Sequence, residues 1–313
     1  MMKILITNYV HPDLIRRFEE MGHEVVYNPD YKYEDLASEI EAYHGIVINT
    51  KIKMTKEMID FGKNLKFIGR LGSGLDIIDL DYAAQKDIKV ISTPEGNRNA
   101  VAEHVFAMLL ALNNNIIQAD KEIRAGIWER EKNRGVELEN KVFGLVGLGN
   151  TGQSVASKLS PWTQAVLYYD KYLLETPNHL PNIESVSLEE LQKRCDIISF
   201  HVPLTKETKQ MVDKEFINNC KNGVILINTS RGKVANIADL IHGLETKKLG
   251  GLCLDVFENE KTQSYSQDEQ ELYKSLFQQE KTVFTPHIAG WTHESLQKIA
   301  NVMVDKVQKA FKY

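Results

Sequence analysis

A glycine-rich turn between an apolar strand and a helix is the feature that most constrains the fold of this chain. Residues 142–146 (VFGLV) form an apolar run that predicts a buried strand, and they lead directly into residues 147–152 (GLGNTG) and a helix-like stretch. In this spacing Gly147 permits a tight turn, Gly149 lets the backbone approach a pyrophosphate, and Gly152 lets helix and strand pack closely. Unpaired N–H groups at the start of the helix attract phosphate. The sequence therefore predicts a dinucleotide site here, with a glycine turn that binds no ligand as the alternative.

An acidic residue follows the glycine turn at the distance that such a site requires. Asp170 closes the next predicted strand, residues 165–169, and lies 18 positions after Gly152. A carboxylate at this point accepts hydrogen bonds from both ribose hydroxyls and repels a 2′-phosphate. The sequence therefore favours NAD over NADP, although the neighbouring Lys171 weakens the preference slightly.

Short apolar strands alternate with helical stretches along the chain, which predicts parallel, doubly wound α/β sheets. At about 150 residues per domain, a chain of 313 residues suggests two domains. We expect residues 99–124 to form one long helix between the two lobes, residues 292–311 to be helical, and the polar tract 258–271 to be a surface loop. The predicted strands occupy residues 3–7, 23–27, 45–49, 65–69, 89–92, 142–146, 165–169, 197–200, 224–228 and 251–255.

Composition and charge exclude several classes of protein. Hydrophobic residues make up 42% of the chain, so global disorder is excluded. The net charge of −5 disfavours a nucleic-acid or anionic-membrane binder, and the longest apolar run, residues 105–112, is far shorter than the roughly 20 residues of a membrane span. The cysteines and histidines lack the spacing of a disulfide framework or a metal site. We therefore expect a cytoplasmic protein without a metal.

Three polar side chains follow predicted strands in the second half of the chain: Arg231, Glu260 and His287. Because ligands bind outside the carboxyl ends of the strands in an open parallel sheet, these side chains are expected to converge beside the glycine turn. An arginine binds a substrate carboxylate and polarises a carbonyl, and a histidine exchanges the hydroxyl proton. A nearby carboxylate raises the pKa of an imidazole and orients its ring. Each residue alone would suit a surface or structural role, but together they predict hydride-transfer chemistry.

Nine ordered motifs, spread over nearly the whole chain, carry a family resemblance. They are GRLGSGLD at residues 69–76, DLD at 79–81, TPEGN at 93–97, VAEH at 101–104, GLGNTG at 147–152, HVPLT at 201–205, NTSRG at 228–232, DVFENE at 255–260 and PHIA at 286–289. With these motifs the sequence resembles the D-isomer-specific 2-hydroxyacid dehydrogenases. The resemblance implies two Rossmann-like lobes, a discontinuous substrate domain of residues 1–98 plus 288–313 and an NAD-binding domain of residues 99–287. It also implies a homodimer through the NAD-binding domain, with Trp128 and Arg130 in a segment that often reaches across the dimer.

The resemblance assigns expected roles to individual residues. Arg231, Glu260 and His287 match the family's catalytic residues, and Asp255 matches an acid that binds the nicotinamide carboxamide. The expected substrate-binding residues are Ser73 and Gly74, whose amides would hold the carboxylate, together with Asn97, Lys51 and Arg70. The expected cofactor-binding residues are Gly147, Leu148, Gly149, Asn150, Thr151, Gly152, Asp170, His201, Pro203, Thr208, Thr229, Asp255, Ala289 and Gly290.

The sequence looks most like short 3-phosphoglycerate dehydrogenases, in which Lys51 and Arg70 would bind the phosphate. Those enzymes usually have an Arg-Ser pair where Asn49 and Thr50 stand here, so glycerate, hydroxypyruvate or glyoxylate is the alternative substrate. A second departure is Lys261, where many members have proline. In a different class, the C-terminal-binding-protein corepressors resemble the same family and sense NAD(H) without needing turnover.

Overall fold

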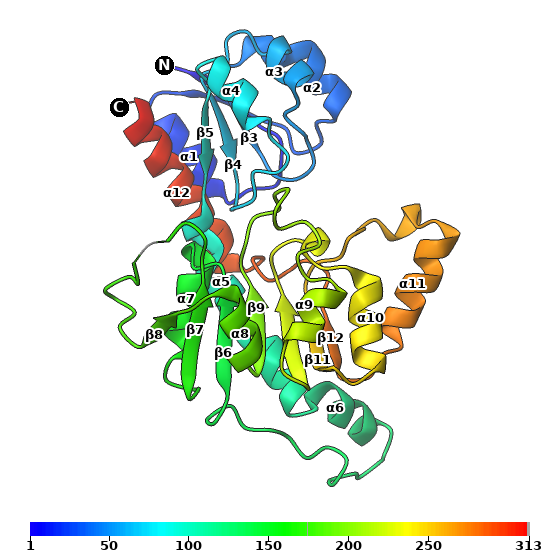
Figure 1. Ribbon diagram of the computed structural model, residues 1–313. Coiled ribbons are helices and arrows are strands. Elements are labelled where there is room, and N and C mark those ends of the chain that lie inside the picture. Colours follow the sequence, from blue (N-terminus) through cyan, green and yellow to red (C-terminus); the bar gives the residue numbers. More distant parts are fainter. Residues whose placement is uncertain (174, 312–313) are drawn as a thin grey trace. The chain divides into compact units, whose positions relative to one another are not determined.

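The computed structural model describes residues 1–173 and 175–311, and the chain divides into two compact units (Figure 1). Unit 1 holds Met1–Asn99 together with the segment from Trp291 onward, and unit 2 holds Ala100–Gly290. The domain boundaries expected from the sequence, at 98/99 and 287/288, lie near these two junctions. Each unit is built on one parallel sheet with helices on both faces, which confirms the predicted α/β fold class.

Unit 1 contains a five-stranded sheet in the order β2-β1-β3-β4-β5. Side chains alternate between its faces, so Ile4 and Ile6 pack under α1 and α12 while Leu5 packs under α2, α3 and α4 (Figure 1). The strands are β1 (Lys3–Ile6), β2 (Glu24–Tyr27), β3 (Gly45–Ile48), β4 (Phe67–Arg70) and β5 (Lys89–Ser92). The helices are α1 (Pro12–Glu20), α2 (Tyr33–Glu39), α3 (Lys56–Phe61), α4 (Leu80–Gln85) and α12 (His293–Phe311).

Unit 2 contains a seven-stranded sheet in the order β12-β11-β10-β9-β6-β7-β8. The chain runs outward from β6 in one direction and returns to β9 on its other side, so the order reverses between β6 and β9. This reversal is the point at which doubly wound sheets bind ligands, outside the carboxyl ends of their strands. The strands are β6 (Val142–Val146), β7 (Ala165–Tyr169), β8 (Ile183–Ser185), β9 (Ile197–Phe200), β10 (Val224–Asn228), β11 (Leu249–Leu254) and β12 (Thr282–Phe284).

Helices cover both faces of the unit 2 sheet. One face packs against α5 and α7, and the other packs against α8, α9, α10 and α11. The helices are α5 (Pro94–Asn113), which begins in unit 1, α6 (Ile116–Arg124), α7 (Asn150–Leu159), α8 (Leu188–Arg194), α9 (Lys214–Asn219), α10 (Ile237–Glu245) and α11 (Gln267–Phe277). Within the described residues, no single helix is long and apolar enough to cross a bilayer, and only α5 and α6 taken together, bent by 60°, reach that length and composition.

Two sequence predictions of secondary structure are wrong. The single helix expected at residues 99–124 is two helices, because Asn115 adopts a left-handed conformation with φ of 53° that asparagine tolerates better than most residues. The loop expected at residues 258–271 contains the start of α11. Here Ser266 accepts a hydrogen bond from the Glu269 N–H while the Glu269 carboxylate accepts one from the Ser266 N–H, a capping box that starts a helix within a polar tract.

Candidate active site

Three neighbouring strands of unit 2 carry the predicted catalytic residues on the loops that follow them. Asn228, Leu254 and Phe284, which end β10, β11 and β12, are paired in register, so the three strands end side by side. Arg231, Glu260 and His287 lie on the loops that leave these ends. The convergence expected from the sequence has a direct structural cause, because the parallel register brings the loops to one edge of the sheet.

Glu260 and His287 form a close pair at this edge. The Nδ1 atom of His287 lies 2.9 Å from Oε2 of Glu260, and each side chain is about two-fifths exposed. Burial alone would raise the pKa of the Glu260 carboxyl. This effect is outweighed by the hydrogen bond and charge of His287, a backbone hydrogen bond at Phe257 and the charge of Arg231, so the pKa lies below its ordinary value. The carboxylate is therefore ionised at neutral pH. It fixes the imidazole through Nδ1 and leaves Nε2 available to exchange a proton.

The Arg231 loop is held against the Glu260 loop by direct backbone packing. A Cβ atom on Gly232 would overlap the carbonyl of Phe257, so only glycine allows the two loops to lie this close. Asn228 shapes the Arg231 loop, because its side-chain amide donates to the Arg231 carbonyl at 2.9 Å and accepts from the Ser230 N–H at 3.0 Å. The Arg231 guanidinium donates to the Ser230 carbonyl at 2.8 Å, and it lies near enough to Glu260 for its charge to lower the pKa of that carboxyl.

His287 has a left-handed backbone, with φ of 56°, which is unusual for a residue other than glycine. Asp255 holds this conformation: its carbonyl accepts from the His287 N–H at 2.8 Å, and its two carboxylate oxygens accept from the N–H groups of Ile288 and Ala289 at 2.9 Å each. Asp255 is fully buried. The carboxylate of Asp255 lies on the backbone of the histidine loop, and the contact with the nicotinamide carboxamide expected from the sequence stays a prediction.

The glycine turn after β6 has the form of a phosphate cradle. Gly147 has φ of 94°, and a Cβ on it would lie 2.6 Å from the carbonyl oxygen of His201. A Cβ on Gly152 would overlap the carbonyl oxygen of Gly147, whereas a Cβ on Gly149 would meet nothing within 4 Å. Gly149 caps α7 without a side-chain hydrogen bond, so the first N–H groups of that ten-residue helix face the open space. This geometry fits a pyrophosphate approaching the backbone at Gly149.

Two polar groups near the cradle also suit a bound dinucleotide. Asp170 Oδ2 accepts from the Leu148 N–H at 2.7 Å, which ties the acid at the end of β7 to the glycine turn. The hydroxyl oxygen of Thr229, just after β10, is buried and has no hydrogen-bond partner among residues 1–173 and 175–311. A polar ligand group would satisfy it.

The remaining predicted cofactor residues of the loop after β9 are ordered by local hydrogen bonds. His201 Nε2 lies 2.9 Å from Ser199 Oγ, and burial lowers the pKa of His201 to about 3, so the imidazole is neutral. Thr208 donates from its hydroxyl to the Pro203 carbonyl at 2.6 Å. These contacts give the loop a defined shape beside the glycine turn, since the Gly147 backbone packs against the His201 carbonyl.

The five predicted substrate-binding residues all belong to unit 1. Arg70 is buried, and its guanidinium donates to the Leu71 carbonyl beneath the turn at Gly72, where a Cβ would overlap the guanidinium. Lys51 is exposed and donates to the Pro29 carbonyl at 3.0 Å. Ser73, Gly74 and Asn97 are exposed or half-buried, with Ser73 and Gly74 following β4 and Asn97 in the first turn of α5.

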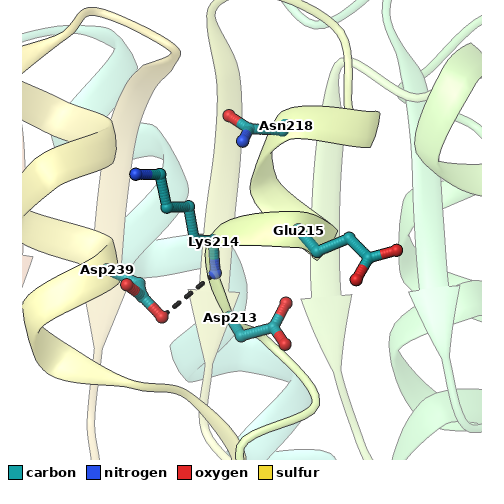
Figure 2. Close-up of a pocket in the computed structure, with 5 residues that line it drawn as sticks. All are labelled: Asp213, Lys214, Glu215, Asn218 and Asp239. Carbon is teal, nitrogen blue, oxygen red and sulfur yellow. Dashed lines mark hydrogen bonds between the residues drawn. The ribbon is translucent and has the colours of Figure 1, made fainter.

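The cavities among the described residues of unit 2 include the following two. One of about 400 Å³ adjoins the Glu260–His287 pair and is lined by aromatic rings that include Phe257 and Tyr265. The other, of about 440 Å³, is lined by Asp213, Lys214, Glu215, Asn218 and Asp239 (Figure 2). Its two aspartates already serve the backbone, because Asp213 accepts from the Phe216 N–H and Asp239 from the Lys214 N–H. Among the described residues, no three His, Cys, Asp or Glu side chains gather as metal ligands.

The fold of unit 2 and its glycine cradle define a dinucleotide-binding domain. A sequence model described as "D-isomer specific 2-hydroxyacid dehydrogenase, NAD binding domain" matches residues 106–289. The chain belongs to this family, which confirms the predicted family and NAD as its cofactor.

Individual relatives agree with this assignment. The chain is 37% identical to a hydroxypyruvate reductase from Thermotoga maritima over 84% of this chain and 83% of that protein. It is 34% identical to D-3-phosphoglycerate dehydrogenase from Archaeoglobus fulgidus over 98% of this chain and 56% of that protein, so it spans about half the length of that relative. The crystal structure of D-lactate dehydrogenase from Aquifex aeolicus, complexed with NAD and lactic acid, matches with a TM-score of 0.84 at 30% identity, over 99% of this chain and 95% of that one.

Several residues that shape the site were missed by the sequence reasoning. Gly232 and Asn228 lie within a motif that was recognised, but only the packing shows that they join two loops. Thr285 contacts both the buried Asp255 and His104, and no local pattern marks Thr285 as their neighbour.

Proposed function

We propose that the protein is an NAD-dependent dehydrogenase that interconverts a D-2-hydroxy acid and the corresponding 2-oxo acid. The observation that carries this proposal is the 2.9 Å pair of Glu260 and His287 at the same strand edge as the glycine cradle. The Arg231 loop packs against the Glu260 loop at that edge. The arrangement supplies an anion-binding cation, a proton-exchanging imidazole and a charge partner for it.

In this mechanism each residue has one task. A bound nicotinamide supplies or accepts the hydride. Arg231 binds the substrate carboxylate and polarises the carbonyl. The Nε2 atom of His287 donates a proton to the carbonyl oxygen in reduction and removes the hydroxyl proton in oxidation. Glu260 holds the Nδ1 proton and balances the imidazolium charge.

The substrate that we propose first is 3-phosphoglycerate. Two relatives named D-3-phosphoglycerate dehydrogenase, from Archaeoglobus fulgidus and Methanocaldococcus jannaschii, support this choice at 34% and 31% identity. On this proposal Ser73 and Gly74 hold the carboxylate, Asn97 contacts the substrate, and Lys51 and Arg70 bind the phosphate. Lys51 is exposed, and its ammonium, which donates one hydrogen bond to the Pro29 carbonyl, has further N–H groups to offer a phosphate.

A second candidate substrate is an unphosphorylated acid such as hydroxypyruvate, glycerate or glyoxylate. The burial of Arg70, with its guanidinium on the Leu71 carbonyl, favours it, because a buried guanidinium does not clamp a phosphate without moving. The Thermotoga relative is itself named hydroxypyruvate reductase.

Turnover of NADH with a panel of acids tests both proposals. The panel contains 3-phosphohydroxypyruvate, hydroxypyruvate, glyoxylate, pyruvate and a branched 2-oxo acid, with NADPH alongside. His287→Ala should abolish turnover of the preferred acid while NADH still binds. Wild-type protein that binds NADH and turns over none of these acids would favour a sensor of NAD(H) related to the corepressors.

We also propose that the protein forms a homodimer through unit 2. Apolar side chains on and just after α6 are exposed: Ile116, Ile117, Ile123, Ile127 and Trp128, the last at 78%. Such a patch is the usual mark of a protein interface. Sedimentation equilibrium should give twice the chain mass for the wild type and the single-chain mass for Ile123→Asp, whereas Tyr172→Asp, an exposed control elsewhere in unit 2, should leave the dimer intact.

The buried, free thiols of Cys195, Cys220 and Cys253 support a reducing compartment such as the cytoplasm.

A further inference from the structure

A line of three polar side chains runs from α5 to the loop of His287. His104 Nε2 lies 2.9 Å from Thr285 Oγ1, and Thr285 Oγ1 lies 2.5 Å from Asp255 Oδ1. The side chain of Asp255 is 1% exposed and that of His104 is 19% exposed, so the line lies almost wholly inside unit 2. None of the chemical steps proposed above uses His104.

The direction of each hydrogen bond follows from the groups themselves. The carboxylate of Asp255 has no proton to donate, so Thr285 donates its hydroxyl proton to Asp255. A hydroxyl has one proton, and Thr285 must therefore accept its second hydrogen bond from His104. His104 thus carries a proton on Nε2, and the chain of donors runs from His104 through Thr285 to Asp255. Consecutive hydrogen bonds of this kind strengthen one another in a buried setting.

Asp255 is the group that holds the candidate catalytic histidine in its unusual backbone conformation. It accepts from the N–H groups of three consecutive residues, His287, Ile288 and Ala289. A non-glycine residue in the left-handed region persists only where its surroundings impose that conformation. The Asp255 carbonyl therefore holds the amide of His287, and the Asp255 carboxylate holds the two amides that follow, so Asp255 fixes the backbone that carries the His287 imidazole.

We propose that His104 is a positioning residue for His287, acting through Thr285 and Asp255. The expected effect on catalysis rests on the proposed function, whereas the expected effect on the loop of His287 does not. Without the Nε2–H of His104, the Thr285 hydroxyl is free to rotate away from Asp255, and the Asp255 carboxylate then keeps only two of its three donors, the N–H groups of Ile288 and Ala289. The fold of α5 does not depend on His104, because the helix is anchored by buried apolar side chains such as Val105, Met108 and Leu109.

Hydrogen–deuterium exchange tests the structural part without any need for turnover. In His104→Leu the amides of residues 287–289, which donate to Asp255, should exchange at least about tenfold faster than in the wild type. His104→Gln keeps an N–H donor and should restore most of the protection. Thr285→Val, which removes the hydroxyl at nearly constant volume, should reproduce the fast exchange if His104→Leu does not fold. The control His242→Leu, at an exposed histidine of α10, should change nothing.

Kinetics test the catalytic part on the acid that the wild type prefers. A misplaced imidazole should lower kcat of His104→Leu by about tenfold or more with little change in KM or in NADH affinity, and His104→Gln should recover most of the loss. Unchanged exchange of the 287–289 amides in both His104→Leu and Thr285→Val would overturn the proposal. A wild type without turnover would refute the proposed function, while the exchange experiment would still decide whether His104 holds the loop.

Discussion

The substitution Gly149→Ala separates cofactor binding from folding at one position of the glycine turn. Gly149 has φ of −72° and ψ of −160°, which alanine adopts without strain. A Cβ there meets nothing within 4 Å. The methyl group therefore occupies only the space through which a pyrophosphate would approach the start of α7.

The expected magnitudes differ sharply between the free and the bound protein. In the free protein, alanine reduces the entropy of the unfolded chain, which stabilises by about 0.4–1 kcal/mol, but it is a poorer helix cap than glycine by about 0.5–1 kcal/mol. These effects nearly cancel, so the free energy of unfolding should change by less than about 0.5 kcal/mol. In the bound protein, loss of one hydrogen bond to a charged phosphate costs about 1.5–3 kcal/mol, which weakens NADH binding about 10- to 150-fold.

Gly152→Ala is the matched control from the same turn. Its Cβ would overlap the Gly147 carbonyl oxygen, so the backbone must shift. Such overpacking costs about 1–3 kcal/mol, and it should lower Tm by about 2–4 °C for each kcal/mol. Thermal unfolding without cofactor should therefore separate the two variants, with Gly149→Ala close to wild type.

Titration of NADH by fluorescence or calorimetry completes the test. Wild-type affinity in Gly149→Ala would refute the reasoning, because it would mean that no phosphate approaches the backbone at this residue. A large fall in Tm for Gly149→Ala would refute the claim that the space beside it is open.

Three other substitutions test the rest of the site. Asp170→Ala should weaken NADH and raise the relative affinity for NADPH, since a charge that repels a 2′-phosphate is removed; an unchanged ratio of the two dissociation constants would contradict the ribose assignment. Glu260→Gln should lower kcat about tenfold or more with little change in NADH affinity, because His287 loses the carboxylate that lies 2.9 Å from its Nδ1. The pKa of Glu260 lies below its ordinary value, so the group beside His287 is a carboxylate at neutral pH, and an unchanged kcat would exclude this role. Gly232→Ala should drive the Arg231 loop off the Phe257 carbonyl and lower kcat/KM about 100-fold at constant NADH affinity; a change in kcat/KM below twofold would show that the loop contact is unimportant.

Most of the fold could be predicted because its buried strands are contiguous apolar runs. The segment VILIN of β10 is apolar until its last residue, and the structure begins and ends the strand where the sequence predicted. All the predicted strands occur within two residues of their expected ends. The short edge strands β8 (IES) and β12 (TVF) offer too few apolar residues to be recognised alone, and they exist because a neighbouring strand pairs with them.

The candidate site was predictable as far as it follows from strand order. Arg231, Glu260 and His287 each follow a strand, and the rule that parallel strands end at one edge brings them together. The placement of Arg70 does not follow from any such rule. Its guanidinium lies under the chain only because Gly72, with φ of 117°, leaves the space that a side chain would fill. The guanidinium of Arg70 packs beneath the turn that precedes Ser73, a position that the sequence does not indicate.

The conformation of His287 shows most clearly what local sequence cannot encode. Position 287, within the segment TPHIAG, is a histidine and not a glycine, yet its backbone is left-handed with φ of 56°. The conformation is imposed by Asp255, which lies 32 positions earlier, directly after β11, and accepts hydrogen bonds from three successive amides. Strain of about 1–3 kcal/mol at such a residue persists only when distant contacts over-determine it. The position of the proton-exchanging imidazole therefore depends on the packing of β11 against β12, and on the buried contacts of Asp255 with Thr285 and His104, more than on the residues beside it.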